Sequence, residues 1–204
     1  MNIVIKSDPV SFRAPTIEEI TAGGYSPSDI DAGFLLSNNV SIKAPSFDFG
    51  DTPIGIDSSF TQGTNARVYK FENVFDPLTP EGGPNSGEIA VKSGSLTFDA
   101  IPVVNDSGKI DVWMEKINYD NFTNGAWYDD FARNIEGNYL NATGGALELY
   151  DKLELITDVN DLKSDFSQLS GSMYANITQR EQNIGEVFNN ALDILQNSEN
   201  NTKE

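Results

Sequence analysis

The sequence contains no cysteine and no histidine, and it has few basic residues for its length. Without cysteine the chain forms no disulfide, thiolate zinc site or iron–sulfur cluster, and without histidine it has no Ser-His-Asp or Cys-His catalytic pair. Its 204 residues include 13 Lys and Arg against 31 Asp and Glu, a formal net charge of −18. Because nucleic-acid affinity comes mainly from basic residues that displace counterions, this balance argues against a nucleic-acid partner.

Long apolar runs are also absent, since no stretch approaches the roughly 18 residues of a membrane helix. Residues 1–9 lack the charged leader and apolar stretch of a secretory signal peptide, so we expect an exported protein to be a longer chain of which this is a fragment. Asp29, Asp31, Asp48 and Asp51 offer oxygen ligands near turns, but they match neither an EF-hand nor a glycine-rich calcium repeat. We therefore predict no metal site and no cofactor.

The first half of the chain contains a repeated pattern of alternating apolar residues. Residues 3–12, 40–49 and 89–98 each place two β-branched residues around an outward position, followed by a small or turn residue and two more apolar residues that end in Phe. Alternation by two indicates a strand with one buried face. A β-sandwich would show the same alternation, but the Lys shared by the three copies and their equal corner spacing favour a β-solenoid.

We therefore predict a right-handed parallel β-solenoid with insertions, followed by an α-helical segment. The inward residues of the predicted solenoid ladder are Ile3, Ile5, Val40, Ile42, Phe47, Phe49, Ile89, Val91, Leu96 and Phe98. Further strands are predicted at 34–36, 54–56, 67–74, 101–104 and 110–114. The spacing of Thr16 and Glu19 is that of a capping box, which predicts a short helix that ends near Gly23.

After Lys116 the apolar spacing changes to three and four, which indicates helices. The predicted helical faces are Trp127, Phe131 and Ile135; Leu149, Tyr150, Leu153 and Ile156; and Val159, Leu162, Phe166, Leu169 and Met173. Gly171 interrupts the last face, and a narrower one continues on a polar helix over 172–198. The charged residues of that helix exclude lipid as its surroundings.

At the junction between these regions, residues 110–116 precede a helical adaptor, and residues 169–175 read Leu-Ser-Gly-Ser-Met-Tyr-Ala. This arrangement resembles the passenger-to-barrel junction of Gram-negative type V autotransporters. That segment is similar to the family's Leu-Ser-Gly-Glu-x-His-Ala segment before the pore helix, with Ser172 in place of the acid and Tyr174 in place of the histidine. The asparagine-rich, cysteine-free composition is most similar to the very large fusobacterial outer-membrane adhesins of that family.

The resemblance implies a non-enzymatic, membrane-proximal stem of an adhesin at the cell surface and outer membrane. It implies a solenoid passenger end at 1–117, a helical cap at 118–170 that templates passenger folding, and a pore helix at 171–204 that leads to a β-barrel beyond Glu204. The implied partners are that barrel, the outer membrane, the barrel-assembly machinery, and a host or bacterial surface receptor. The implied cap residues are Trp113, Tyr119, Phe122, Trp127 and Phe131; those of the helix junction are Leu169, Gly171, Tyr174, Ile177, Ile184 and Phe188.

Alternatives remain open at this point. Some family members cut themselves by cyclisation of an asparagine on the pore helix, and Asn189 and Asn190 resemble that site. The chain is alternatively an adhesive module that binds a surface ligand directly, through a Pro/Gly-rich loop at 77–87. A third reading is a carbohydrate-cleaving β-solenoid enzyme, which would use two of the carboxylates.

Overall fold

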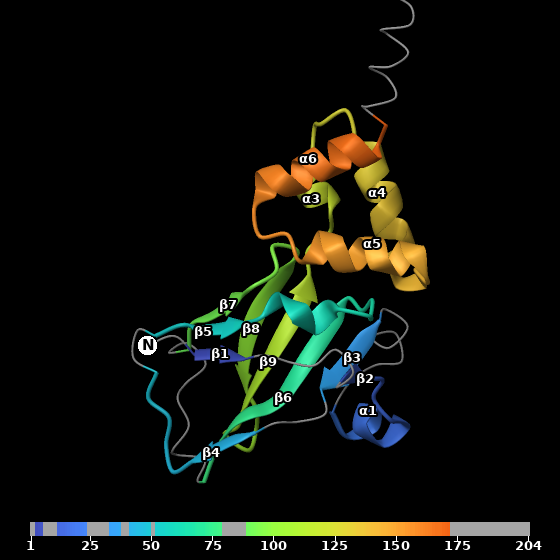
Figure 1. Cartoon of the computed structure of the whole chain (residues 1–204). Coiled ribbons are helices and arrows are strands. Elements are labelled where there is room, and N and C mark those ends of the chain that lie inside the picture. Colours follow the sequence, from blue (N-terminus) through green and yellow to red (C-terminus); the bar gives the residue numbers. More distant parts are fainter. Residues whose placement is uncertain are drawn as a thin grey trace, which may run out of the picture. The chain divides into compact units, whose positions relative to one another are not determined.

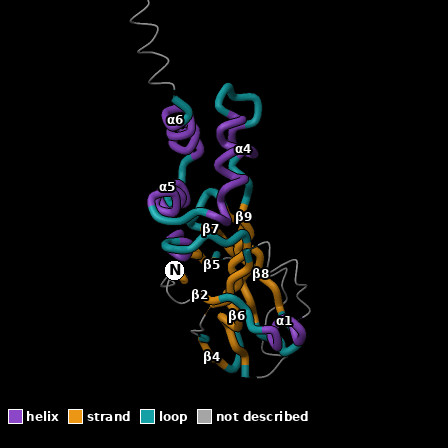
Figure 2. The backbone as a smooth tube through the Cα atoms, turned by 90° about the vertical axis from the view of Figure 1, so that its right-hand side faces the viewer, coloured by secondary structure: helices purple, strands orange, loops and turns teal. Residues whose placement is uncertain are grey.

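The computed structural model describes residues 3–5, 12–23, 33–37, 41–49, 52–78 and 89–171. The chain divides into two compact units, Met1–Leu162 and Lys163–Glu204. In the first unit the strands end at Lys116, and the helices that follow begin at Asp120 (Figure 1). Figure 2 shows the same change of structure from the side, with strands in orange and helices in purple.

The larger sheet has six strands and mixes both strand directions. Its members are β2 (Phe12–Arg13), β3 (Phe34–Ser37), β4 (Ile42–Ala44), β6 (Val68–Pro77), β8 (Phe98–Val104) and β9 (Ile110–Lys116). The order is β2-β3-β6-β9-β8, and β4 pairs with the end of β6. Strands β3 and β4 run parallel to β6, whereas the β2–β3, β6–β9 and β8–β9 pairs are antiparallel.

The smaller sheet has three parallel strands, β1 (Ile3–Ile5), β5 (Ile54–Ile56) and β7 (Val91–Ser93). In its register Ile54 stands between Ile3 and Val91. The predicted strands at 34–36, 54–56, 67–74, 101–104 and 110–114 all coincide with strands of the two sheets, so those predictions are confirmed.

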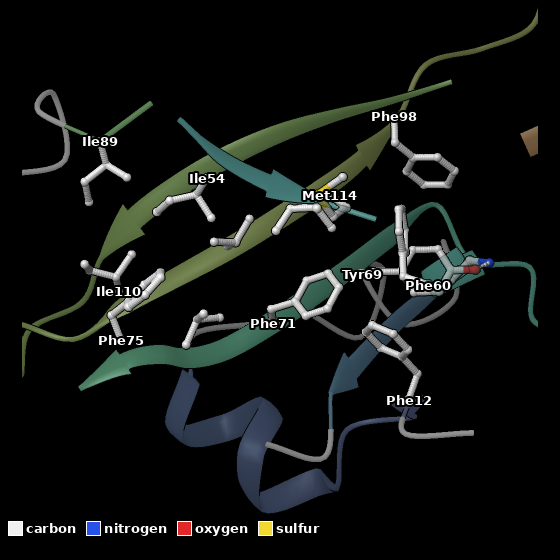
Figure 3. Close-up of a cluster of buried hydrophobic side chains, with 14 of the residues drawn as sticks. Phe12, Ile54, Phe60, Tyr69, Phe71, Phe75, Ile89, Phe98, Ile110 and Met114 are labelled. Carbon is white, nitrogen blue, oxygen red and sulfur yellow. Dashed lines mark hydrogen bonds between the residues drawn. The ribbon is translucent and has the colours of Figure 1, made fainter. Parts of the chain in front are cut away.

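One apolar core joins the two sheets. Ile54 and Ile56 of β5 are buried together with Phe71 and Phe75 of β6 and Ile110 of β9, as Figure 3 shows for several of these side chains. Phe60, in the 3₁₀ helix η2 (Ser58–Thr61), is fully buried in the same core. The two sheets therefore share one interior, which removes the apolar face of each from water.

The predicted β-solenoid is wrong. A solenoid would stack the three copies of the repeat directly on one another in parallel, but β5 separates the first copy from the third, and the second pairs with β6 in the other sheet. Ile42 is 46% exposed in β4, and Phe98 begins a strand that is antiparallel to β9. Alternation shows that one face of a strand is buried, but it contains no information on the direction or identity of the neighbouring strands.

The other ladder residues have varied positions. Phe47 and Phe49 follow β4, stack on one another and pack against Phe75. Ile89 is buried just before β7, whereas Leu96 is half-buried between β7 and β8. For Ile3 and Ile5 the structure describes the backbone pairing alone, and Val40 lies outside the described residues.

The first helix, α1 (Ile17–Gly23), confirms the predicted capping box. The Thr16 backbone N–H donates to Glu19 Oε2 at 2.8 Å, and the Glu19 N–H donates to Thr16 Oγ1 at 3.2 Å. These bonds satisfy backbone donors that the start of a helix leaves without partners. Arg13 adds a 2.7 Å bond to Glu19, and this bond holds the pKa of Glu19 down at about 2.

The helices after the sheet are α3 (Asp120–Thr123), α4 (Asp129–Asn138), the 3₁₀ helix η5 (Tyr139–Asn141), α5 (Gly145–Glu154) and α6 (Val159–Leu169). Their buried residues include Ile135, Tyr150, Leu153, Leu162 and Phe166, all from the predicted helical faces. Among the described residues, no helix has the length and apolar character needed to cross a membrane.

Candidate functional site

A buried lysine stands where the last strand meets the helices. Ile110, Val112 and Met114 of β9 point into the core and are fully buried, and Lys116 continues this alternating inward series. The Lys116 side chain has no exposed surface. A charged amine removed from water needs compensation nearby, since the cost of its desolvation is several kcal/mol, on the order of that for other buried ions.

Two glutamates from the helices face this amine. Glu136 of α4 places Oε2 3.4 Å from Lys116 Nζ, and Glu154 at the end of α5 places Oε1 3.9 Å from it. The exposed fractions of the two glutamate side chains are 8% and 1%. We call these three residues the junction cluster, because they join the end of β9 to two helices.

Glu136 is held by several donors. Nη1 of Arg67, the residue just before β6, lies 2.6 Å from Glu136 Oε1, and the Tyr119 backbone N–H donates to Glu136 Oε2 at 3.0 Å. The guanidinium pairs with the negative charge of the Glu136 carboxylate, and the backbone donor forms a charge-assisted hydrogen bond with it. Glu136 is thus the anionic member of the junction cluster.

Glu154 has different surroundings. The Tyr119 hydroxyl lies 3.5 Å from Glu154 Oε1, and Ser95 Oγ donates to the Glu154 backbone oxygen at 2.8 Å. Burial raises the pKa of Glu154 to about 7, although the positive charge of Lys116 opposes the rise. Burial thus favours the neutral carboxylic acid form of Glu154.

Aromatic rings complete the walls around the amine. Lys116 Nζ lies 3.6 Å from the ring centroid of Tyr119, 4.6 Å from that of Tyr139 and 5.7 Å from that of Phe98. The ring faces attract the ammonium and exclude water from it. Burial lowers the pKa of Lys116, with Glu154 and Glu136 acting in the opposite direction. Burial also raises the pKa of Tyr119 and Tyr139 well above the usual value, and Glu154 adds to this effect.

The local sequence explains why these groups meet. Tyr150 and Glu154 are four residues apart on α5, so both face the same side of that helix. The Tyr150 ring stacks on that of Tyr119, with 6.3 Å between the ring centroids. The Tyr150 hydroxyl donates to the Ile135 backbone oxygen at 2.6 Å and so ties α5 to α4 next to Glu136. These contacts hold α5 against α4 and Tyr119 beside the junction cluster.

A second buried lysine lies within the larger sheet. Lys70 Nζ is 3.1 Å from Asp111 and 3.2 Å from Glu72, and it lies 5.3 Å from the ring centroid of Trp113. Because these partners belong to β6 and β9, the pairing stabilises the two central strands against each other. In the described residues no group of three or more Asp and Glu side chains is arranged to hold a metal ion.

The structure also has a cavity of about 450 Å³ at the edge of the two sheets. It is lined mainly by β7 and the start of β8, including Lys92, Leu96 and Asp99. Ile101 and Val103 on the neighbouring stretch of β8 are 39% and 37% exposed, respectively. This edge combines a hollow with apolar side chains that solvent can reach.

The residues expected to form the cap differ in burial and in the elements that carry them. Tyr119 is fully buried in the wall of the junction cluster, while Trp113 lies in β9 with its ring 5.5 Å from that of Phe34. Phe122 and Phe131 are half-buried, and Trp127 is 64% exposed just before α4. Of these five residues, Tyr119 lines the junction cluster in the described part of the chain.

Of the expected helix-junction residues, Leu169 is the last residue of α6 and is 42% exposed. Gly171 has a φ of 97°, which glycine adopts without strain, and its N–H donates to the Gln168 oxygen to close the helix. Tyr174, Ile177, Ile184, Phe188, Asn189 and Asn190 lie outside the described residues, as does most of the predicted loop at 77–87. Its first residue, Pro77, is the last residue of β6.

Sequence reasoning missed Lys116, Glu136 and Glu154. A signal was present at Lys116, because it is the fourth member of an alternating series whose other members are apolar. Glu154 likewise extends the face of Tyr150 by one helical turn. A charged residue that continues a buried face indicates a buried ionic partner.

Comparison with known proteins gives a family match for the part of the chain that contains the strands. Residues 29–118 match the family model of the BigA beta sandwich domain. The match spans β3 to β9 and covers less than half of the chain, and it indicates an adhesin-like, surface-associated bacterial protein. A sandwich family also argues against the parallel β-helix expected from the sequence. No curated protein and no solved structure matches the chain.

The matched segment ends two residues after Lys116, so it contains the lysine of the junction cluster but neither glutamate. The partners of Lys116 come from helices that follow the matched β-domain. The junction cluster is therefore a feature of the way this chain continues beyond that domain.

Proposed function

We propose that the chain is a membrane-proximal stem of an autotransporter-type bacterial adhesin, which connects its outer regions to the membrane anchor. The family match supports a surface adhesin, and the resemblance of residues 110–116 and 169–175 to the passenger junction supports the position in the stem. The role requires a β-domain and helices that unfold as one body, because a stem must transmit force without opening.

The observation that carries this proposal is the junction cluster. The last strand of the β-domain ends in a buried amine, and its compensating carboxylates lie on α4 and α5. Removal of the helices would leave the Lys116 amine without its two carboxylate partners. The β-domain and the helices consequently depend on each other for stability.

Hydrogen exchange on the whole chain tests this dependence. We expect backbone amides of β9 and of α4 and α5 to exchange through the same opening event, with similar protection. Substitution of Glu136 by Gln should lower the protection of both regions together, whereas Glu148→Gln, on the exposed side of α5, should change neither. Helices that exchange through a much easier opening than β9 would contradict the stem role.

The second candidate is an adhesive module, and the cavity beside β7 and β8 favours it. Beads coated with the whole chain would test it on host cells and on other bacteria. Direct adhesion that is lost on Lys92→Glu or Asp99→Arg would support a binding site in the cavity. Beads that do not adhere, together with coupled exchange of β9 and the helices, would favour the stem.

A further inference from the structure

The junction cluster contains the parts of a chemical reaction. A primary amine, a carboxylic acid and a carboxylate meet in a space that side chains close off, with side-chain exposures of 0% for Lys116, 1% for Glu154 and 8% for Glu136. An amine and a carboxylic acid condense to an amide with loss of water. In bulk water this condensation is slow, but fixed contact between the two groups and exclusion of water both favour it.

We propose that Lys116 and Glu154 form an intramolecular isopeptide bond, with Glu136 as the base that moves the protons. The inference rests on the geometry of the junction cluster and is independent of the stem role. Lys116 Nζ is the nucleophile, Cδ of Glu154 is the carbon attacked, and the leaving group is the hydroxyl of the Glu154 acid.

The surroundings assign different roles to the two glutamates. The Glu136 carboxylate pairs with Arg67 at 2.6 Å and accepts from the Tyr119 N–H, and a carboxylate engaged in this way is a poor target for a nucleophile. Glu154 forms no ion pair with an arginine among the described residues, and burial raises its pKa to about 7. Its protonated form has a hydroxyl that can depart as water, so it is the better electrophile although Glu136 lies closer to Nζ.

The same surroundings favour loss of a proton from the Lys116 amine. Burial lowers the pKa of Lys116, so loss of its proton is easier than in water. Glu136 Oε2, 3.4 Å from Nζ, is placed to take that proton. Glu136 contacts the reacting amine directly and therefore acts as a catalytic residue for this single turnover.

The step balances without any co-reactant. Glu136 takes one proton from the Lys116 ammonium, and the freed electron pair attacks Cδ of Glu154 to give a tetrahedral intermediate. The Tyr119 hydroxyl, 3.5 Å from Glu154 Oε1, is placed to donate to the negative oxygen of this intermediate. Glu136 passes its proton to the departing hydroxyl and accepts the second amine proton. The products are an amide, one water molecule and a protonated Glu136.

The bond would close the chain between the end of β9 and the end of α5. Helices α3, α4 and α5 would lie in a covalent loop that global unfolding could not open. Such a closure restricts the unfolded chain in the way a disulfide does, in a protein that contains no cysteine.

Mass spectrometry of the whole 204-residue chain, purified in its folded form, tests the proposal. We expect an intact mass lower than that of the sequence by the mass of one water molecule. Trypsin should fail to cut after Lys116, and fragmentation should show one branched peptide that joins Lys116 to Glu154. An unchanged mass in folded protein would overturn the proposal, as would a linkage of Lys116 to Glu136.

Three variants test whether the loss of mass comes from the proposed reaction between Lys116 and Glu154. Lys116→Met and Glu136→Gln should both retain the full sequence mass, the first for lack of the amine and the second for lack of the base. Lys109→Arg, a matched change at a partly exposed lysine just before β9, should still lose one water molecule. Loss of water in Lys116→Met would overturn the proposal, and loss of water at the wild-type rate in Glu136→Gln would overturn the role of the base.

Discussion

The interior between the two sheets and the interior around the junction cluster are built from different chemistry. The first consists of apolar side chains, with Phe60 at its centre in edge-to-face contact with Tyr69 at 5.0 Å and Phe98 at 5.2 Å. The second combines tyrosines with one lysine and two glutamates that hardly contact solvent. These two regions meet at Phe98, whose ring also faces Lys116.

This difference in chemistry decides how the stability of each region responds to substitution of a side chain. Apolar contact is not directional, so a core of this kind adapts when one side chain is replaced by another of similar volume. A buried ionic cluster is stable only while every charge retains its partner, since each ion left alone keeps its full desolvation cost. The sheet core should therefore tolerate conservative changes that the junction cluster does not.

The largest effect is expected from Glu136→Gln, which preserves size but removes the charge. Arg67 and Lys116 would both lose their closest carboxylate partner, and we expect a loss of about 4 kcal/mol in the free energy of unfolding. Denaturant unfolding of the variant and the wild type measures this loss. A change below about 1 kcal/mol, similar to that expected for the exposed Glu148→Gln, would remove the contrast between the two regions.

The next effect is a dependence of stability on pH, measured in a Lys116→Met chain so that no cross-link can form. The Glu154 pKa is raised from 4.5 to about 7 by burial, and loss of the lysine charge removes the main interaction that opposes the rise. Because the folded pKa exceeds the unfolded one, the stabilisation from Glu154 is complete below pH 4.5 and is lost as pH rises through 7 and above.

Between pH 4.5 and 8, we expect the free energy of unfolding of the Lys116→Met chain to fall by about 3 kcal/mol more than that of a Lys116→Met/Glu154→Gln chain. Urea unfolding of both chains at several pH values measures the difference. Parallel stability curves for the two chains would mean that Glu154 titrates normally and is not confined as described.

A smaller effect is expected from Phe60→Leu in the sheet core. The Phe60 side chain is fully buried, but leucine is apolar and only somewhat smaller. We therefore expect a loss of about 1 kcal/mol in the free energy of unfolding. The midpoint of denaturant unfolding gives the value. A loss as large as that of Glu136→Gln would show that the sheet core is as intolerant as the junction cluster.

The smallest effect is expected from Trp127→Ala. Trp127 is 64% exposed and its ring contacts Tyr128, so we expect a change within about 0.5 kcal/mol and no effect on refolding rate. Stopped-flow refolding and equilibrium unfolding test both statements. A clear slowing of refolding would restore Trp127 to the folding role that the resemblance to autotransporters implies.

Local patterns in the sequence predicted the elements well. Thr16 and Glu19 marked the start of α1, and the three-and-four spacing that includes Tyr150, Leu153 and Phe166 marked helices whose buried sides contain those residues. Both signals depend on groups within one or two helical turns, so neither needs the rest of the chain. The strands at 54–56 and 110–114 were found in the same way, from alternation by two.

The predictions that depended on which strands pair with each other were wrong. Ile5, Ile42 and Val91 have the same local pattern, yet Ile42 pairs with Phe75 in one sheet, and β5 separates the other two strands in the second. The choice between parallel and antiparallel neighbours depends on how connections fold back and on which apolar faces meet. A single strand's alternation does not encode that choice.

The sequence by itself determined the acidic surface, the change from strands to helices near residue 117 and the position of most elements, because charge, periodicity and capping act over a few residues. Tertiary structure alone decided the mixed sheets and the junction cluster. Lys116, Glu136 and Glu154 are distant in the sequence, and no local pattern there shows that they meet. They form one chemical site because β9, α4 and α5 bring them within 4 Å of a common point, in a space from which water is excluded.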